Sequence, residues 1–223
     1  MKSRLKIKEL AIVLVGHFNP IIYHPHWMAR KDLVSSTEAD AAKIKINHPE
    51  VSEFEFEYCS LQVLKNRFTA TSAQETHFKK VKDLVRSILD CLPECPIAQV
   101  GINLHHHYDF EKKKPYVDFG HKIVPKEALW KTVLDNPGVL NIAIKGDRDD
   151  DYLGYRAVYM NVSNKVQPYG VRIHVNDHYE LYSARETRSI DSLKAIELLD
   201  DVFISSTQKS EEIIKRIHEY GSA

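Results

Sequence analysis

The sequence contains few glycines, and their spacing excludes the common phosphate-binding loops. Of the eight glycines, the closest neighbours along the chain, such as Gly138 and Gly146, stand eight residues apart. A Walker A loop needs two glycines five residues apart, and a dinucleotide-binding loop needs glycines two and three residues apart, because backbone amides must approach a phosphate there. The chain also contains neither a Gly-x-Ser-x-Gly nor a His-Glu-x-x-His motif. These absences exclude phosphate binding through such loops, a serine nucleophile elbow and a zincin metal site.

Cysteine is scarce, and no long apolar run is present. The three cysteines, Cys59, Cys91 and Cys95, form no Cys-x-x-Cys pair. An odd count without a signal peptide predicts a reduced, cytoplasmic protein with unpaired thiols; a redox pair or half of a metal site is the alternative. The longest uncharged stretch, residues 10–29, is a poor membrane span because its apolar run ends at Val15. We therefore expect no contact with a membrane.

Charge of neither sign dominates the chain. There are 31 Lys and Arg against 31 Asp and Glu, so the net charge is zero. Balanced charge argues against nucleic acid as a partner, because non-specific binding needs a net basic surface. Basic residues at 2–8 and 112–114 leave nucleic-acid binding as a minor hypothesis. The acidic run 147–151 predicts a solvated turn; a divalent-cation loop is the alternative, but the run lacks the spacing of an EF-hand.

Residue periodicity predicts an α+β fold. Phe54, Phe56 and Tyr58 alternate with glutamates, as in a strand with one apolar and one acidic face. Ser72 and Glu75 predict a capping box at the start of a helix. Further strands are expected at 10–15, 61–71, 97–108, 139–145, 155–163 and 170–182, and helices within 21–43 and at 75–92, 124–134 and 189–220.

Short connections between consecutive strands determine the expected architecture. They predict mostly antiparallel sheets with helices packed on one face. We expect a single domain over residues 1–223, two-lobed, with a seam between the lobes near 111–118.

Histidine is present in excess, at twelve residues, and its placement predicts two polar rows. Alternate residues of a strand share a face and lie about 7 Å apart, a span from which two imidazoles can bind one metal ion. The first row is Asn103, His105, His107 and Asp109, and the second is His174, Asn176, His178 and Glu180.

The two rows support two interpretations. If they converge, zinc or another divalent transition metal bound by His105, His107, Asp109, His174 and His178 would activate water, with Asp109 or Glu180 orienting a ligand or acting as a base. If they do not, they cover a solvated sheet face and pair with neighbouring acids. Both interpretations require residues 97–108 and 170–182 to be extended.

Tyrosines near the second row provide candidates for partner binding. Tyr155 and Tyr159 share one side of a predicted strand, and Tyr179 lies in the next one. Aromatic stripes usually belong to a core, but tyrosine-rich sheet faces also suit protein recognition. We expect Tyr155, Tyr159 and Tyr179 to contact a partner.

The order of several segments resembles that of a known family. Asn66–Thr71 leads into the helix at 75–92 and then into the apolar strand Pro96–Leu104, which contains one glycine. The helix around Leu193–Ile204 is similar in character. In these features the chain resembles a sporadically distributed family of uncharacterised bacterial proteins. The resemblance implies a soluble bacterial protein, and the family's patchy distribution implies a phage-defence or toxin–antitoxin locus; it supplies no catalytic residues.

Two functions from different classes follow from the sequence. The first is a binding or interaction module that presents a sheet face or groove to a protein partner or to a second copy of itself. The alternative is a metal-dependent hydrolase or nuclease that uses the histidine rows. The sequence leaves open whether the chain is an enzyme.

Overall fold

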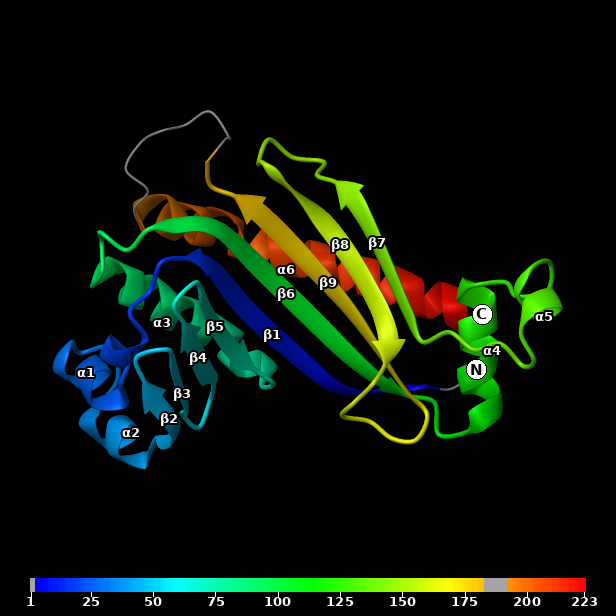
Figure 1. The fold of residues 1–223 in the computed structure, drawn as a ribbon, viewed down its shortest axis with the longest axis horizontal. Helices are drawn as coiled ribbons and strands as arrows, with labels where there is room; N and C mark the ends of the chain where they lie inside the picture. Colours follow the sequence, from blue (N-terminus) through cyan, green and yellow to red (C-terminus); the bar gives the residue numbers. More distant parts are fainter. Residues whose placement is uncertain (1–2, 183–191) are drawn as a thin grey trace.

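The structure, a computed structural model, describes residues 3–182 and 192–223. Its strands form one antiparallel sheet of nine strands in the order β2-β3-β4-β5-β1-β6-β9-β8-β7 (Figure 1). The predicted α+β class with antiparallel strands is therefore confirmed. The strands are β1 (Arg4–Gly16), β2 (Lys43–His48), β3 (Val51–Glu55), β4 (Ser60–Leu64), β5 (Arg67–Ser72), β6 (Ile97–Asp109), β7 (Asn141–Asp147), β8 (Gly154–Val162) and β9 (Gly170–Glu180).

The helices differ widely in length. The longest, α6, has 30 residues, whereas α5 is a single turn of four. The helices are α1 (Pro25–Arg30), α2 (Ser36–Ala41), α3 (Phe78–Asp90), α4 (Lys113–Ile123), α5 (Trp130–Val133) and α6 (Leu193–Ser222), with short 3-10 turns η1 (Pro20–Ile22) and η2 (Glu75–His77). Among the described helices, none combines the length and the hydropathy that a membrane-spanning helix needs.

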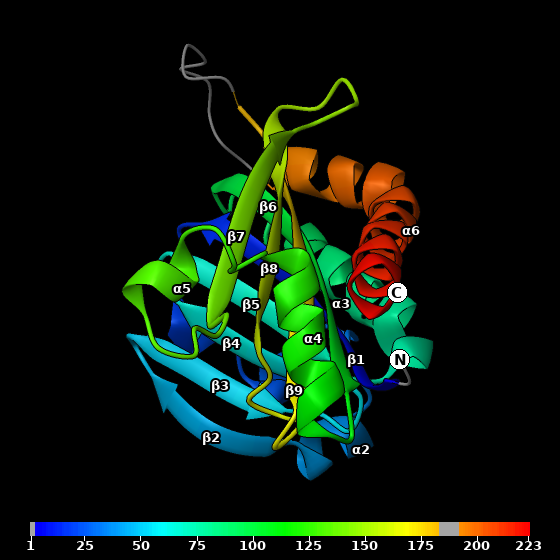
Figure 2. The same ribbon diagram turned by 90° about the vertical axis from the view of Figure 1, so that its right-hand side faces the viewer.

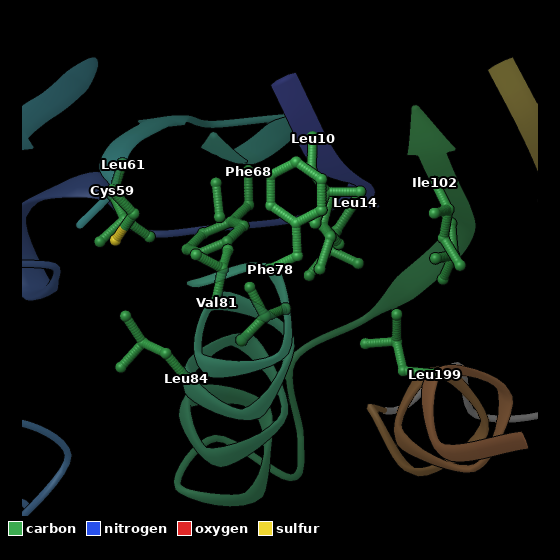
Figure 3. Packing of buried hydrophobic residues seen from close by; sticks show 14 of the residues in the cluster. Leu10, Leu14, Cys59, Leu61, Phe68, Phe78, Val81, Leu84, Ile102 and Leu199 are labelled. Atoms are coloured by element: carbon green, nitrogen blue, oxygen red, sulfur yellow. The ribbon is translucent and has the colours of Figure 1, made fainter. Parts of the chain in front are cut away.

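The core lies between the sheet and helices α3 and α6. Apolar residues of α3 recur at helical spacing and are buried, and Phe78 and Val81 point toward Phe68 and Leu14 on the sheet (Figure 3). Leu199 of α6 points toward Ile102 of β6 in the same view, and both side chains are fully buried. We call this side of the sheet the apolar face.

The two longest strands, β1 and β6, pair along their length at the middle of the sheet. On its other side β1 pairs with β5, which is followed in the sheet by β4, β3 and β2. On its other side β6 pairs with β9, which is followed by β8 and β7. Residues 111–118, where a seam was predicted, form the turn before α4 and the first part of this helix. The division into two lobes remains a prediction.

Several local predictions were wrong. The expected strand 61–71 is the hairpin of β4 and β5, and the expected helix 124–134 is replaced by α4, which starts eleven residues earlier, and by the single turn α5. Pro115 is tolerated because it falls in the first turn of α4. Ser72 does not cap a helix: it ends β5, and its hydroxyl donates to the carbonyl of Tyr58 at 2.7 Å. The capping box that does form joins Ser35 and Glu38.

The C-terminal helix is continuous through the Ser-Ser-Thr segment that we considered a break. The Ser205 hydroxyl donates to the Val202 carbonyl at 3.0 Å, and the Thr207 hydroxyl to the Phe203 carbonyl at 2.9 Å. Hydroxyls that bond to the preceding turn are compatible with a helix. Residues 189–191 of the predicted helix lie outside the described residues.

Candidate functional site

The two histidine rows lie side by side. Residues 97–108 are extended, as predicted, and so are 170–180 of the predicted segment 170–182; they form the neighbouring strands β6 and β9. In their antiparallel register His105 stands opposite His174, and Gly101 stands opposite His178. With the outward residues of β1 and β8, the rows form a surface that we call the polar face. Its residues are Ala11 and Val13 of β1; Gln99, Gly101, Asn103, His105 and His107 of β6; Tyr155, Ala157, Tyr159 and Asn161 of β8; and Arg172, His174, Asn176, His178 and Glu180 of β9.

Burial distinguishes the polar face from the apolar face. Val100, Ile102 and Leu104, which alternate with the polar row on β6, are at most 1% exposed. The side chains of Tyr155, Tyr159 and His174 are partly exposed, and that of His178 is 12% exposed. The polar face is therefore reached by solvent at the positions where the rows meet.

Aromatic rings on the polar face stack across strands in two ladders. The first ladder contains Tyr159, His174 and His105, with ring centroids 5.2 and 4.0 Å apart. The second contains Tyr155 and His178, with centroids 4.5 Å apart. Opposed side chains on neighbouring strands stabilise a sheet by such contacts, so the rings hold one another in fixed orientations.

Hydrogen bonds fix the protonation of His174. The Asn103 side-chain amide nitrogen donates to the Ala11 carbonyl at 3.2 Å, so its oxygen faces His174. Nε2 of His174 lies 3.0 Å from that oxygen and must carry the proton to donate. This leaves Nδ1 of a neutral His174 without a proton.

His107 is fixed by a different partner. The Ser163 hydroxyl oxygen accepts from the backbone amides of Lys165 and Val166, at 3.1 and 2.9 Å. The Ser163 hydroxyl therefore donates its single proton to Nδ1 of His107, which lies 2.7 Å from the hydroxyl oxygen. His107 is 1% exposed, so it supports the loop after β8 rather than the accessible part of the polar face.

Burial keeps the histidines of the first ladder neutral. Desolvation lowers the pKa of His105 to about 2, with the neighbouring His174 and Arg172 adding to the effect. Desolvation and Arg172 lower the pKa of His174 to about 4. Both rings are uncharged at neutral pH, and the first ladder presents aromatic surface rather than positive charge.

The predicted metal ligands do not come together as a chelating set. His105 and His174 are neighbours, but their rings are nearly parallel, at 13°, so their in-plane lone pairs do not point at one another. Asp109 lies at the end of β6, where it accepts from the Glu111 amide at 2.9 Å, and Nε2 of His178 lies 3.1 Å from Glu180. Over the described ranges, no group of three or more His, Cys, Asp or Glu side chains could hold a metal ion.

A hollow of about 150 Å³ opens in the polar face beside the second ladder. Its floor is Gly101, where an added Cβ would stand 3.2 Å from the Asn103 amide nitrogen and 3.4 Å from the Asn176 amide oxygen. Gln99 lines the hollow and donates to Glu180 at 3.2 Å, and Arg67 of β5 stands at its edge. We did not predict Gln99, Gly101 or Arg67; the alternation along β6 would have placed the first two in the row.

Tyr179 lies on the apolar face, unlike Tyr155 and Tyr159. It is 1% exposed, and its hydroxyl donates to Asp177 at 2.8 Å. A partner on the polar face cannot reach it. The structure thus brings Tyr155 and Tyr159 together with the histidine rows and removes Tyr179 from the predicted partner-binding set.

Two aspartates of the acidic run 147–151 form ion pairs with arginines. Arg148 pairs with Asp150 at 2.6 Å, and Arg156 pairs with Asp150 at 3.0 Å and with Asp149. The four aspartates of the run are exposed, as predicted for a solvated turn, and two of them, Asp149 and Asp150, are paired with arginines rather than free to bind a cation.

No protein-family model matches the chain, and no curated protein does. The resemblance to a sporadic bacterial family therefore remains a prediction.

Proposed function

We propose that the protein is a binding module that presents its polar face to a protein partner. The observation that carries this proposal is the pair of ring ladders: Tyr155, Tyr159, His174 and His178 are half-buried and held in place by stacking. Rings that are ordered before binding lose little conformational entropy in a complex. The ladders are thus suited to serve as anchors.

The chemistry of the polar face favours a protein over a nucleic acid. Tyrosine and arginine are enriched at the centres of protein interfaces, whereas lysine and acidic residues are depleted there. The centre of the polar face carries tyrosines, amides and the neutral His105 and His174. The same face carries both Arg67 and Arg172 and the acids Glu180 and Glu9, of which Glu9 pairs with Lys165. A phosphate backbone would need an excess of positive charge.

A photo-reactive amino acid placed on the polar face tests this function in cells of the native host. We expect replacement of Tyr159 to give a discrete cross-linked protein, either a partner or a second copy of this chain. The matched control is Ile204, which is 68% exposed on α6. The proposal fails if neither position, or only Ile204, gives an adduct.

A metal-dependent hydrolase or nuclease is the second candidate, favoured only by the 4.0 Å separation of the His105 and His174 rings. Metal analysis of untagged protein after incubation with zinc or manganese tests it. A stoichiometric metal that is lost in His174→Gln would support it, and no bound metal would end it. The cytoplasmic location and the defence-type locus also remain proposals, to be tested by fractionation and by the neighbouring genes.

A further inference from the structure

A separate cavity of about 190 Å³ lies away from the polar-face hollow. It opens between α4, the segment 137–140 and the ends of β8 and β9, at the edge of the molecule where α4 and α5 lie (Figures 1 and 2). Apolar side chains form most of its wall. They include Phe119 of α4, Val139 and Leu140 of the connecting segment, Met160 and Val162 of β8, and Val171 of β9.

Lys126 lines this apolar cavity although it is only 2% exposed. Its ammonium lies beside Gly120, where an added Cβ would be 4.0 Å from Nζ. Desolvation lowers the pKa of Lys126, as expected for an ammonium removed from water.

No carboxylate of the described residues is paired with the Lys126 ammonium. The adjacent Glu127 uses one oxygen to accept from the Lys126 backbone amide at 2.9 Å. Its other oxygen pairs with Lys131 at 3.2 Å. An ammonium on an apolar wall with little contact to water is stabilised by a nearby anion, so Lys126 suits a ligand that carries a negative charge.

His121 contributes a second buried polar atom to the same cavity. Its Nδ1 has no hydrogen-bond partner within the described part of the chain, and the nearest acidic oxygen, on Glu127, is 3.9 Å away. Lys126 and His121 both line the cavity. Together they offer one full positive charge and one further nitrogen to a ligand.

We propose that this cavity binds a small apolar molecule that carries a single carboxylate, with the carboxylate on Lys126 and the apolar body against Phe119, Met160 and Val171. One ammonium balances one negative charge, whereas a phosphate dianion would need more donors than this wall supplies. A cavity of roughly 150 Å³ accepts a benzene molecule, so this one has room for about one ring or a short alkyl chain. Of the residues that define the polar face, only Asn161 also lines this cavity.

Calorimetric titration of the full chain with phenylacetate, hexanoate and the neutral phenylacetamide tests the proposal. We expect both carboxylates to bind, and phenylacetate to bind at least about tenfold more tightly than its amide. In Lys126→Met that preference should disappear. Lys113→Met, which changes an exposed lysine of α4 that does not line the cavity, should retain it.

A second measurement does not depend on the variant. The ε-methyl NMR signal of Met160, one of only three methionines, should shift saturably when phenylacetate is added to the unchanged protein. The proposal is overturned if the Met160 signal does not respond, if acid and amide bind equally, or if Lys126→Met keeps the preference.

Discussion

At the scale of single residues, Asp177 shows how this protein compensates a buried charge. Its carboxylate is 0% exposed and accepts from Nη1 of Arg148 at 2.6 Å and from Nε of Arg156 at 3.0 Å. The Tyr179 hydroxyl donates to the second oxygen. Both oxygens of Asp177 thus accept from strong donors, whereas no carboxylate within the described residues is paired with the Lys126 ammonium.

We predict that Asp177→Asn is strongly destabilising. It would leave the Arg148 guanidinium, whose side chain is 2% exposed, without its most buried partner. Breaking one side of a buried ion pair costs about 3–5 kcal/mol. Asp149→Asn is the control because that carboxylate is 61% exposed, and it should destabilise the protein far less than Asp177→Asn. Urea unfolding measures both; equal losses would contradict the account.

The neutral histidines predict a loss of stability in mild acid. Below the unfolded pKa of about 6.5 the unfolded chain binds protons that folded His105, His107 and His174 do not accept, so the free energy of unfolding falls as the pH falls. Each group contributes at most about 1.4 kcal/mol per pH unit. The loss levels off near pH 4 for His107 and His174, whose lowered pKa is about 4.

His174→Gln tests this linkage. Between pH 6 and 5 its unfolding free energy should depend less steeply on pH than that of the unchanged protein. An unchanged slope in His174→Gln would show that this ring takes up protons in the folded state.

At the scale of elements, α4 docks on the last turn of α6. Gly221 of α6 is buried against Phe119 of α4, and an added Cβ would come within 2.4 Å of the Phe119 ring. The absence of a side chain at this position is what lets the two helices meet. Phe119 also forms part of the Lys126 cavity, so this contact supports one wall of that site.

We predict that Gly221→Ala destabilises the protein by about 1–3 kcal/mol, because it forces Phe119 out of its place. Gly146→Ala is the control, since nothing lies within 4 Å of the added Cβ at that position. Thermal unfolding followed by near-ultraviolet circular dichroism measures both. If Gly221→Ala lowers the stability no more than Gly146→Ala does, Phe119 can move to accommodate the added methyl group, and the account of the α4–α6 contact is wrong.

The sequence predicted the elements whose pattern is strong and missed those whose pattern is weak. β6 and β9 alternate clearly, and α3 has a regular apolar stripe, so their positions were correct. β2 is exposed along its whole length and has no buried side to produce such a pattern. In α4, only Phe119 is buried, and the lysines and Pro115 of its first turn resemble a loop.

The site was predictable as two rows but not as one surface. Alternation places His105 and His174 on definite sides of their strands. The strands β7 and β8 lie between β6 and β9 in the sequence, but β9 pairs directly with β6 in the sheet. The sequence does not show that β9 takes this position next to β6. Lys126 gave no signal at all, because its burial depends on how α4 and the segment 137–140 close over β8.

At the scale of the whole molecule, the apolar face and the polar face of the sheet differ in what they contact. The apolar face packs against α3 and α6 and holds the fold together, with its central residues at β6 fully buried. The polar face carries stacked rings that solvent reaches. Changes to the half-buried tyrosines should therefore affect binding more than folding.

The most direct measurement is the affinity of the cross-linked partner for variants of the polar face. We predict that the double variant Tyr155→Ser and Tyr159→Ser binds at least about tenfold more weakly by calorimetry, because both ladders lose an outer ring. Ile204→Ser on α6 should bind as the unchanged protein does. Equal affinity of the double variant and the unchanged protein would contradict the claim that the polar face is the binding surface.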